Sequence, residues 1–191
     1  MELDTLMYKY GSDKAQHGYT PMYHSILKHM RNQPIDLLEV GIGTIIPEAP
    51  STMRWCGLGD YKPGGSLRAW RDYFPNGRIV GIDIQPDTQF TEERIDTFLS
   101  DSSNAEEVNN VLGSRMFHVI IDDGLHVDEA QINTMRNLWP RVRPGGYYII
   151  EDIEHENRIP TTLRHKIGEI IGNDGYFFLN EHTNFLLASR K

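Results

Sequence analysis

Two pairs of acidic residues each come directly after an apolar stretch that has the length of a buried strand: Asp122 and Asp123, and Glu151 and Asp152. His126 lies three residues beyond Asp123. Strands that end side by side in an open α/β sheet point toward the crevice where ligands bind. We therefore expect the four carboxylates to gather there, offering oxygen ligands to a hard divalent cation, with His126 as a proton acceptor. The alternative roles are solvated strand ends or helix caps for the acids, and an orienting ring for His126.

A second set of candidate residues lies at the ends of two earlier predicted strands. The first of these strands ends with three residues that a ligand could approach: Glu39, Gly41 and Gly43. Glycine has no Cβ and lets a ligand come close to the backbone. The next strand ends in Asp83, followed by Ile84, and an acid at this position can accept hydrogen bonds from both hydroxyls of a ribose. Ile46 replaces the third glycine of the dinucleotide pattern, so a nucleoside without a pyrophosphate is expected.

Polar residues after a third and a fourth strand extend this candidate nucleoside site. Asp101 and Ser102 follow the third predicted strand and could contact the adenine edge, although they could equally cap the next helix. Asp122 could touch the amino-acid part of the ligand or only support Asp123.

The motifs with these residues resemble those of class I S-adenosylmethionine-dependent methyltransferases: Glu39-Val40-Gly41-Ile42-Gly43, Gly81-Ile82-Asp83 and Pro144-Gly145-Gly146. A further set resembles the macrocin, mycinamicin and rhamnosyl sugar O-methyltransferases: Gly11-Ser12-Asp13-Lys14 with His17 and Tyr19, Gly65-Ser66-Leu67-Arg68-Ala69-Trp70, Tyr73-Phe74-Pro75, Asp122-Asp123-Gly124-Leu125-His126 and Glu151-Asp152. This resemblance runs from Gly11 to Ile153. Leu125 departs from it, because the family often has serine there.

The resemblance implies a reaction and roles for particular residues. Methyl transfer from S-adenosylmethionine to a hydroxyl of a sugar is expected, the sugar being a deoxyhexose such as rhamnose on a glycoside or glycan. A divalent metal, most often Mg²⁺, would be held by Asp123, Glu151 and Asp152, with His126 as the general base. Lys14 and Ser66 would line the cofactor pocket. The alternatives are a catechol-type O-methyltransferase and a catalytically silent S-adenosylmethionine-binding module.

The elements that must position these residues alternate between strand and helix along the chain. The expected strands are 35–40, 78–84, 97–99, 117–122 and 147–153, with a closing antiparallel pair at 176–179 and 185–188. The expected helices are 19–30, 66–73 with Ser66 as N-cap, 104–112, 128–142 and 161–171. Residues 8–17 are expected to form a loop and 143–146 a turn. This order predicts an α/β fold, a doubly wound and mainly parallel seven-stranded sheet of the Rossmann-like methyltransferase type, with helices on both faces and a C-terminal antiparallel hairpin.

Length and composition set the remaining expectations. At 191 residues the chain is expected to form a single domain, with an N-terminal lid or helical segment at 1–33 and a long active-site loop at 44–65. The net charge of −8 argues against an electrostatic nucleic-acid binder. No apolar stretch approaches the roughly 18–20 residues of a membrane span, and the single cysteine fits a reducing, cytoplasmic location. A homo-oligomer is left open.

Overall fold

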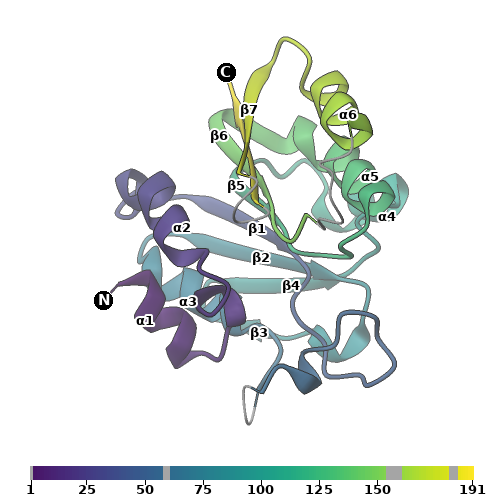
Figure 1. Cartoon of the computed structure of the whole chain (residues 1–191). Coiled ribbons are helices and arrows are strands. Elements are labelled where there is room, and N and C mark those ends of the chain that lie inside the picture. Colours follow the sequence, from purple (N-terminus) through teal and green to yellow (C-terminus); the bar gives the residue numbers. More distant parts are fainter. Residues whose placement is uncertain (1, 58–60, 154–160, 181–184) are drawn as a thin grey trace.

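The central strands are apolar on both faces, as expected for a parallel sheet that is covered by helices on both sides. The computed structural model describes residues 2–57, 61–153, 161–180 and 185–191. Within them one eight-stranded sheet has the strand order β3-β4-β2-β1-β5-β6-β8-β7 (Figure 1). The strands are β1 (Asp36–Val40), β2 (Arg78–Asp83), β3 (Thr91–Glu92), β4 (Ile95–Leu99), β5 (Phe117–Asp122), β6 (Val142–Ile150), β7 (Gly175–Asn180) and β8 (Phe185–Arg190). Strands β4, β2, β1, β5 and β6 run parallel, whereas β3, β7 and β8 each pair antiparallel with a neighbour.

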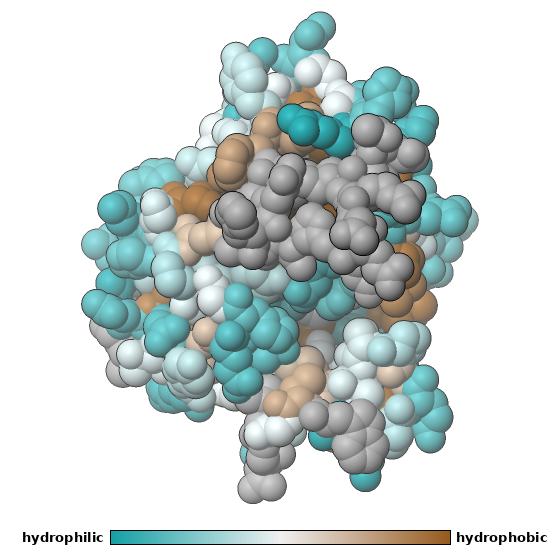
Figure 2. Space-filling view, in the orientation of Figure 1, coloured by the Kyte–Doolittle hydropathy of each residue, from teal (hydrophilic) through white to brown (hydrophobic). Residues whose placement is uncertain are grey.

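In the described part of the chain, three helices cover each face of the sheet (Figure 1). The first layer consists of α1 (Leu3–Lys9), α2 (Thr20–Leu27) and α3 (Gly65–Tyr73), and the second of α4 (Ala105–Leu112), α5 (Asp128–Leu138) and α6 (Thr161–Ile171). Neighbouring residues of one strand serve the two layers, because successive side chains of a strand point to opposite faces. Leu37 of β1 packs in the first core and Leu38 in the second. On the face shown in Figure 2 hydrophilic residues predominate, consistent with apolar side chains packed in these two cores.

The predicted α/β fold with its C-terminal hairpin is confirmed, with one strand more than the predicted seven. The additional strand is β3, which pairs antiparallel with β4. Its two residues are too few for a strand pattern to be visible in the sequence. The helices of the described residues include none with the length and apolar character needed to cross a bilayer.

Several local predictions differ from the structure, among them the helix expected at 19–30, of which α2 ends at Leu27, and the strand expected at 147–153, which is part of β6 and ends at Ile150. Helix α3 begins at Gly65, with Gly64 as its N-cap in the left-handed region (φ 86°), so that Ser66 lies inside the helix. The expected loop 8–17 overlaps the end of α1 and contains a 3₁₀ turn, Asp13–Ala15. The expected turn 143–146 is an irregular part of β6, because Val142 pairs with Phe117 but Tyr147 pairs with Val119. Helix α5 ends at Leu138, and the 3₁₀ turn that follows contains Pro140.

Candidate active site

The ends of three neighbouring parallel strands bring the acidic segments together. In the sheet register Val40 pairs with Asp122, and Asp122 pairs with Ile150. The chain stays paired just beyond the strands, since the amide of Asp123 donates to the carbonyl of Val40 (2.9 Å) and that of Glu151 to the carbonyl of Asp122 (3.0 Å). The residues that follow β1, β5 and β6 therefore lie side by side at the carboxyl edge, as the sequence predicts.

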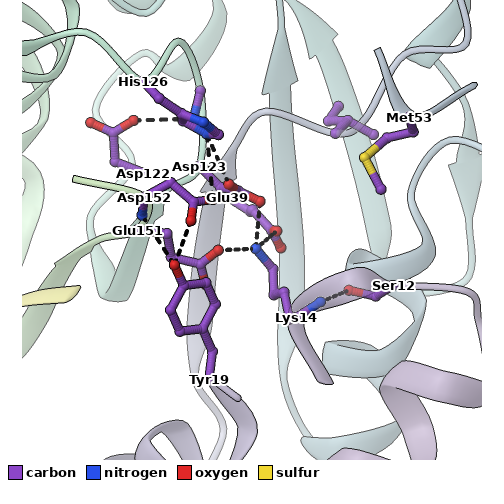
Figure 3. A network of polar contacts seen from close by, with 12 residues as sticks. Ser12, Lys14, Tyr19, Glu39, Met53, Asp122, Asp123, His126, Glu151 and Asp152 are labelled. Atoms are coloured by element: carbon purple, nitrogen blue, oxygen red, sulfur yellow. Dashed lines mark hydrogen bonds and ion pairs between the residues drawn. The ribbon is translucent and has the colours of Figure 1, made fainter. Parts of the chain in front are cut away.

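Asp123, His126 and Asp152 converge at this edge (Figure 3). The Nε2 atom of His126 lies 3.4 Å from Oδ1 of Asp123 and 3.7 Å from Oδ2 of Asp152. One potential ligand atom from each of the three residues lies within 4.8 Å of the others, close enough to hold one metal ion. Asp152 has a positive φ of 48°, a costly conformation outside glycine that often marks a functional site.

Burial of His126 and the carboxylates near it have opposite effects on the pKa of the imidazole. Burial lowers the pKa of the imidazole, but the nearby carboxylates of Asp123 and Asp152 outweigh this effect and raise the pKa above its usual value. The Nε2 atom is buried and has no well-formed hydrogen-bond partner among the described residues. The ring nitrogen is therefore held in an anionic environment with its bonding capacity unused.

The buried ammonium group of Lys14 lies next to Asp123. The Nζ atom of Lys14 is 2.5 Å from Oδ2 of Asp123, 2.5 Å from Oε2 of Glu151 and 3.2 Å from Oε1 of Glu39 (Figure 3). Burial lowers the pKa of Lys14, but the carboxylates outweigh that effect and hold the pKa well above its usual value. Burial raises the pKa of Glu39 and of Glu151. Lys14 is therefore the counter-ion of a carboxylate cluster.

The structure places Glu151 differently from the other two predicted metal ligands. Its carboxylate contacts Nζ of Lys14 and accepts a hydrogen bond from the hydroxyl of Tyr23. It is not among the three residues whose ligand atoms converge. Its role as a metal ligand therefore stays a prediction from the sequence, whereas the geometry groups Asp123 and Asp152 with His126.

A cavity of about 750 Å³ opens beside these residues. Six of the predicted cofactor residues line it: Gly41, Gly43, Asp83, Ile84, Asp101 and Ser102. Four others are buried and are not among the lining residues: Lys14, Glu39, Ser66 and Asp122. The indole of Trp70 donates to Glu39 (2.8 Å), and the hydroxyl of Tyr148 donates to Asp122 (3.1 Å). Burial raises the pKa of Asp122 to about 7. These two acids are buried supports of the site in this structure.

Part of the expected active-site loop 44–65 forms one wall of the cavity, through Thr44, Ala49–Met53 and Cys56. Residues 58–60 of this loop lie outside the described residues. The hydroxyl of Tyr61 donates to the carbonyl of Ile42 (3.1 Å) and so ties the loop to the end of β1.

The glycines after β1 are required by the protein itself. Gly41 and Gly43 both have φ near 84°, where residues other than glycine are strained. A Cβ on Gly41 would lie 2.0 Å from the carbonyl oxygen of Asp123, and one on Gly43 would lie 2.1 Å from the hydroxyl of Tyr61. The absence of a side chain thus lets β1, the Asp123 segment and the loop approach one another.

The polar ends of β2 and β4 both cap backbone and face the cavity. Asp83 accepts hydrogen bonds from the amides of Ile42 (2.7 Å) and Gln85 (2.8 Å), one on each carboxylate oxygen, and burial raises its pKa. Asp101 accepts from the amide of Ser103 (2.9 Å). Both acids therefore cap loop backbone, whereas the N-cap of α4 is Asn104 and not Asp101 or Ser102. Oδ1 of Asp101 also accepts from the hydroxyl of Ser103 (2.7 Å), whereas both oxygens of Asp83 keep further acceptor capacity for a ligand.

Lining residues that were not predicted as site residues include Asp13, His17 and Ser100. Asp13 and His17 belong to the N-terminal motif, but nothing in their spacing says which members of that motif face a cavity. Ser100 directly precedes Asp101 at the end of β4, and its buried hydroxyl has no hydrogen-bond partner within the described part of the chain. The sequence signal that could have identified Ser100 is a polar residue at the end of a predicted strand.

Comparison with known proteins identifies relatives, although no protein-family model matches the chain. The 8-demethyl-8-(2-methoxy-alpha-L-rhamnosyl)-tetracenomycin-C 3'-O-methyltransferase of Streptomyces olivaceus is 37% identical over 155 residues, covering 80% of this chain and 37% of the relative. The mycinamicin VI 2''-O-methyltransferase of Micromonospora griseorubida is 37% identical over 142 residues, covering 72% of this chain and 32% of the relative. The chain thus spans about a third of the length of these curated relatives.

Solved structures agree with the sequence relatives. The MycE methyltransferase from the mycinamycin biosynthetic pathway, in complex with Mg and SAH, has a TM-score of 0.77 and 27% identity, covering 100% of this chain and 55% of the solved one. A second structure of that enzyme, with Mg, SAH and mycinamycin VI, has a TM-score of 0.78.

Proposed function

This chain is a homologue of sugar O-methyltransferases, and from that relationship we propose that it transfers a methyl group from S-adenosylmethionine to a hydroxyl of a sugar. The proposed acceptor is a deoxyhexose such as rhamnose, carried by a glycoside or glycan. The observation that supports this most is the convergence of Asp123, His126 and Asp152 at a cavity of about 750 Å³. The site provides a basic nitrogen and two carboxylates beside a space that is large enough for small-molecule ligands.

The residues present fit a divalent cation. Oδ1 of Asp123 and Oδ2 of Asp152 face Nε2 of His126, which has no hydrogen-bond partner among the described residues, and the two carboxylates supply the negative charge that a cation needs. Carboxylate oxygens with no cysteine favour Mg²⁺, Mn²⁺ or Ca²⁺. Asp123 and Asp152 would hold the cation, with Glu151 as the predicted third ligand. A bound divalent cation lowers the pKa of a hydroxyl that it coordinates and fixes the oxygen in place.

His126 is proposed as the general base. Methyl transfer forms a bond between the sugar oxygen and the methyl carbon and breaks the bond between that carbon and sulfur, which keeps the electron pair. The hydroxyl proton would pass to Nε2 of His126, whose place between Asp123 and Asp152 stabilises the resulting imidazolium. The two carboxylates also fix the ring in position for this transfer.

The nucleoside of the methyl donor is proposed to lie along the ends of β1, β2 and β4. Asp83 lines the cavity and has acceptor capacity for ribose hydroxyls, while Asp101 and Ser102 lie where an adenine edge would be read. Gly41 and Gly43, which follow β1, line the same cavity. A cytoplasmic location is proposed with this function, since the single cysteine, Cys56, is exposed and unpaired.

A transfer assay tests the proposed function. The full chain is incubated with S-adenosylmethionine and a panel of rhamnosides and catechols, with Mg²⁺ or with EDTA, and products are identified by mass spectrometry. Methylated rhamnosides that form with Mg²⁺ and vanish with EDTA are expected. Turnover of catechols alone would show that the acceptor is an aromatic diol and not a sugar. Binding of S-adenosylmethionine without transfer to any acceptor would indicate a silent binding module.

A further inference from the structure

The two carboxylates that face His126 are each held on their other oxygen by a residue of the N-terminal segment (Figure 3). Nζ of Lys14 donates to Oδ2 of Asp123 at 2.5 Å, and the hydroxyl of Tyr19 donates to Oδ1 of Asp152 at 2.5 Å. The remaining oxygens, Oδ1 of Asp123 and Oδ2 of Asp152, are the ones near His126. Each carboxylate thus has one oxygen that accepts a hydrogen bond from the N-terminal segment and one oxygen that faces His126.

We propose that Lys14 and Tyr19 are positioning residues, which determine which oxygen of Asp123 and of Asp152 is presented to the bound cation and to His126. This inference rests on the proposed function, because it assigns a purpose to contacts around a cation that the proposal introduces. It gives the N-terminal motif a role in the cation centre, where the sequence predicted a contact with the methyl donor for Lys14. Partners of this kind commonly set the orientation of metal ligands and with it metal affinity.

The two positioning residues form one rigid unit. The amide of Tyr19 donates to the carbonyl of Lys14 (3.0 Å), so that the two residues are joined through the backbone. Both side chains are buried, Lys14 at 2% and Tyr19 at 3% exposure. The ring of Tyr19 packs against Phe185 at a centroid distance of 5.9 Å. A displacement of one partner would therefore displace the other.

Tyr19 also supports the strained backbone of Asp152. The amide of Asp152 donates to the same hydroxyl (3.4 Å) that donates to its carboxylate. A single hydroxyl therefore contacts both ends of a residue whose φ is 48°. Loss of this hydroxyl would leave Asp152 free to relax toward a conformation in which its carboxylate no longer faces His126.

Lys14 has a competing, purely structural role, because it also neutralises Glu39 and Glu151. Removal of the Lys14 ammonium group would leave buried carboxylates unpaired and destabilise the fold. Tyr19→Phe is therefore the primary variant, since it deletes one hydroxyl and keeps the packed ring. Tyr73→Phe is the matched control, because the hydroxyl of that buried tyrosine contacts Nδ1 of His24 (3.0 Å) and no carboxylate of the site.

The experiment measures Mn²⁺ affinity by calorimetry on the full chain without sugar, together with the affinity for S-adenosylhomocysteine and the unfolding temperature. Tyr19→Phe is expected to weaken Mn²⁺ binding about 10- to 100-fold, with S-adenosylhomocysteine affinity and unfolding temperature matching those of Tyr73→Phe. Lys14→Met is expected to weaken Mn²⁺ binding and, unlike Tyr19→Phe, also to lower the unfolding temperature, because Glu39 and Glu151 lose their counter-ion. This split separates positioning from general loss of structure.

The outcomes distinguish this inference from the proposed function. Wild-type Mn²⁺ affinity in Tyr19→Phe overturns the positioning role and leaves the methyltransferase proposal standing. Equal weakening of Mn²⁺ and S-adenosylhomocysteine binding also overturns it, because the hydroxyl would then act on the whole fold. A wild-type chain that binds no Mn²⁺ removes both the inference and the cation from the proposed function.

Discussion

The imidazole of His126 is set apart from the other histidines of the described segments by what surrounds it. Burial lowers its pKa, but Asp123 and Asp152 raise the pKa above the ordinary value, so that a proton taken up by Nε2 is stabilised. The surface residue His165, for comparison, contacts one carboxylate, that of Glu169 in the next helical turn (3.1 Å). Two acids from different strands around one imidazole are the feature that supports a proton-transfer role.

Replacement of His126 by alanine tests this role. We expect His126→Ala to lower turnover about 100- to 10,000-fold, the usual contribution of a positioned acid–base group. The affinity for S-adenosylhomocysteine should stay within a factor of a few, because the proposed nucleoside contacts come from Asp83, Asp101 and Ser102 and not from the imidazole. Turnover with Mg²⁺ and calorimetric binding would be measured on the same preparation. His165→Ala is the control, and wild-type turnover in His126→Ala would remove the base from the mechanism.

The ends of β1 and β5 approach so closely that only glycine fits between them. Gly41 and Gly18 have similar positive φ values, 84° and 75°, but their surroundings differ. A Cβ on Gly41 would lie 2.0 Å from the backbone of Asp123, whereas one on Gly18 would meet nothing within 4 Å. Alanine variants at Gly41 and Gly18 therefore distinguish the cost of a left-handed backbone from the cost of a steric conflict between the ends of β1 and β5.

Alanine substitutions at these two positions give a matched comparison. Both should lose about 1–2 kcal/mol from the left-handed backbone. Gly41→Ala should lose about 1–3 kcal/mol more, because the segment that carries Asp123 must move to admit the methyl group. Urea unfolding followed by circular dichroism measures the free energy of unfolding of each variant. Equal losses would show that the two strand ends are free to separate.

The sequence reveals the strand ends but not the directions of their side chains. Runs such as 117–121 predict buried strands, and the register of parallel strands then brings Asp123 and Asp152 to one edge. The backbone leaves the extended conformation just beyond β6, where Asp152 has a φ of 48°. Glu151 and Asp152, adjacent in the sequence, accordingly have different partners, Lys14 and Tyr23 for the one and Tyr19 and His126 for the other.

Contacts between residues far apart in the chain could not be predicted from the sequence. Lys14 is 109 residues from Asp123 and 137 from Glu151, and no local pattern encodes such a pairing. Ser66 shows a similar limit at short range. A serine before an apolar helix predicts an N-cap, but Gly64 takes the left-handed position and Ser66 is buried in the helix.

Across the whole molecule, the cavity is assembled from segments that lie far apart in the chain. Its wall includes Asp13 before α2, Met53 in the long loop, Asp83 after β2 and His126 before α5. Unfolding would scatter these segments, so a ligand of the cavity binds the folded chain and not the unfolded one. Binding must therefore stabilise the folded state in proportion to the logarithm of ligand concentration over Kd.

Thermal unfolding with S-adenosylhomocysteine tests whether the cavity as a whole is the binding site. At a ligand concentration of 100 times Kd, the expected stabilisation is about 2.7 kcal/mol, which raises the unfolding temperature of a chain of this size by about 5–10 °C. Asp83→Ala should reduce this rise relative to its own ligand-free protein, since Asp83 lines the cavity. Asp87→Ala is the control, because Asp87 also accepts a backbone amide, that of Ile45 (2.9 Å), without lining the cavity. A full rise in Asp83→Ala, or an equal reduction in both variants, would place the nucleoside elsewhere.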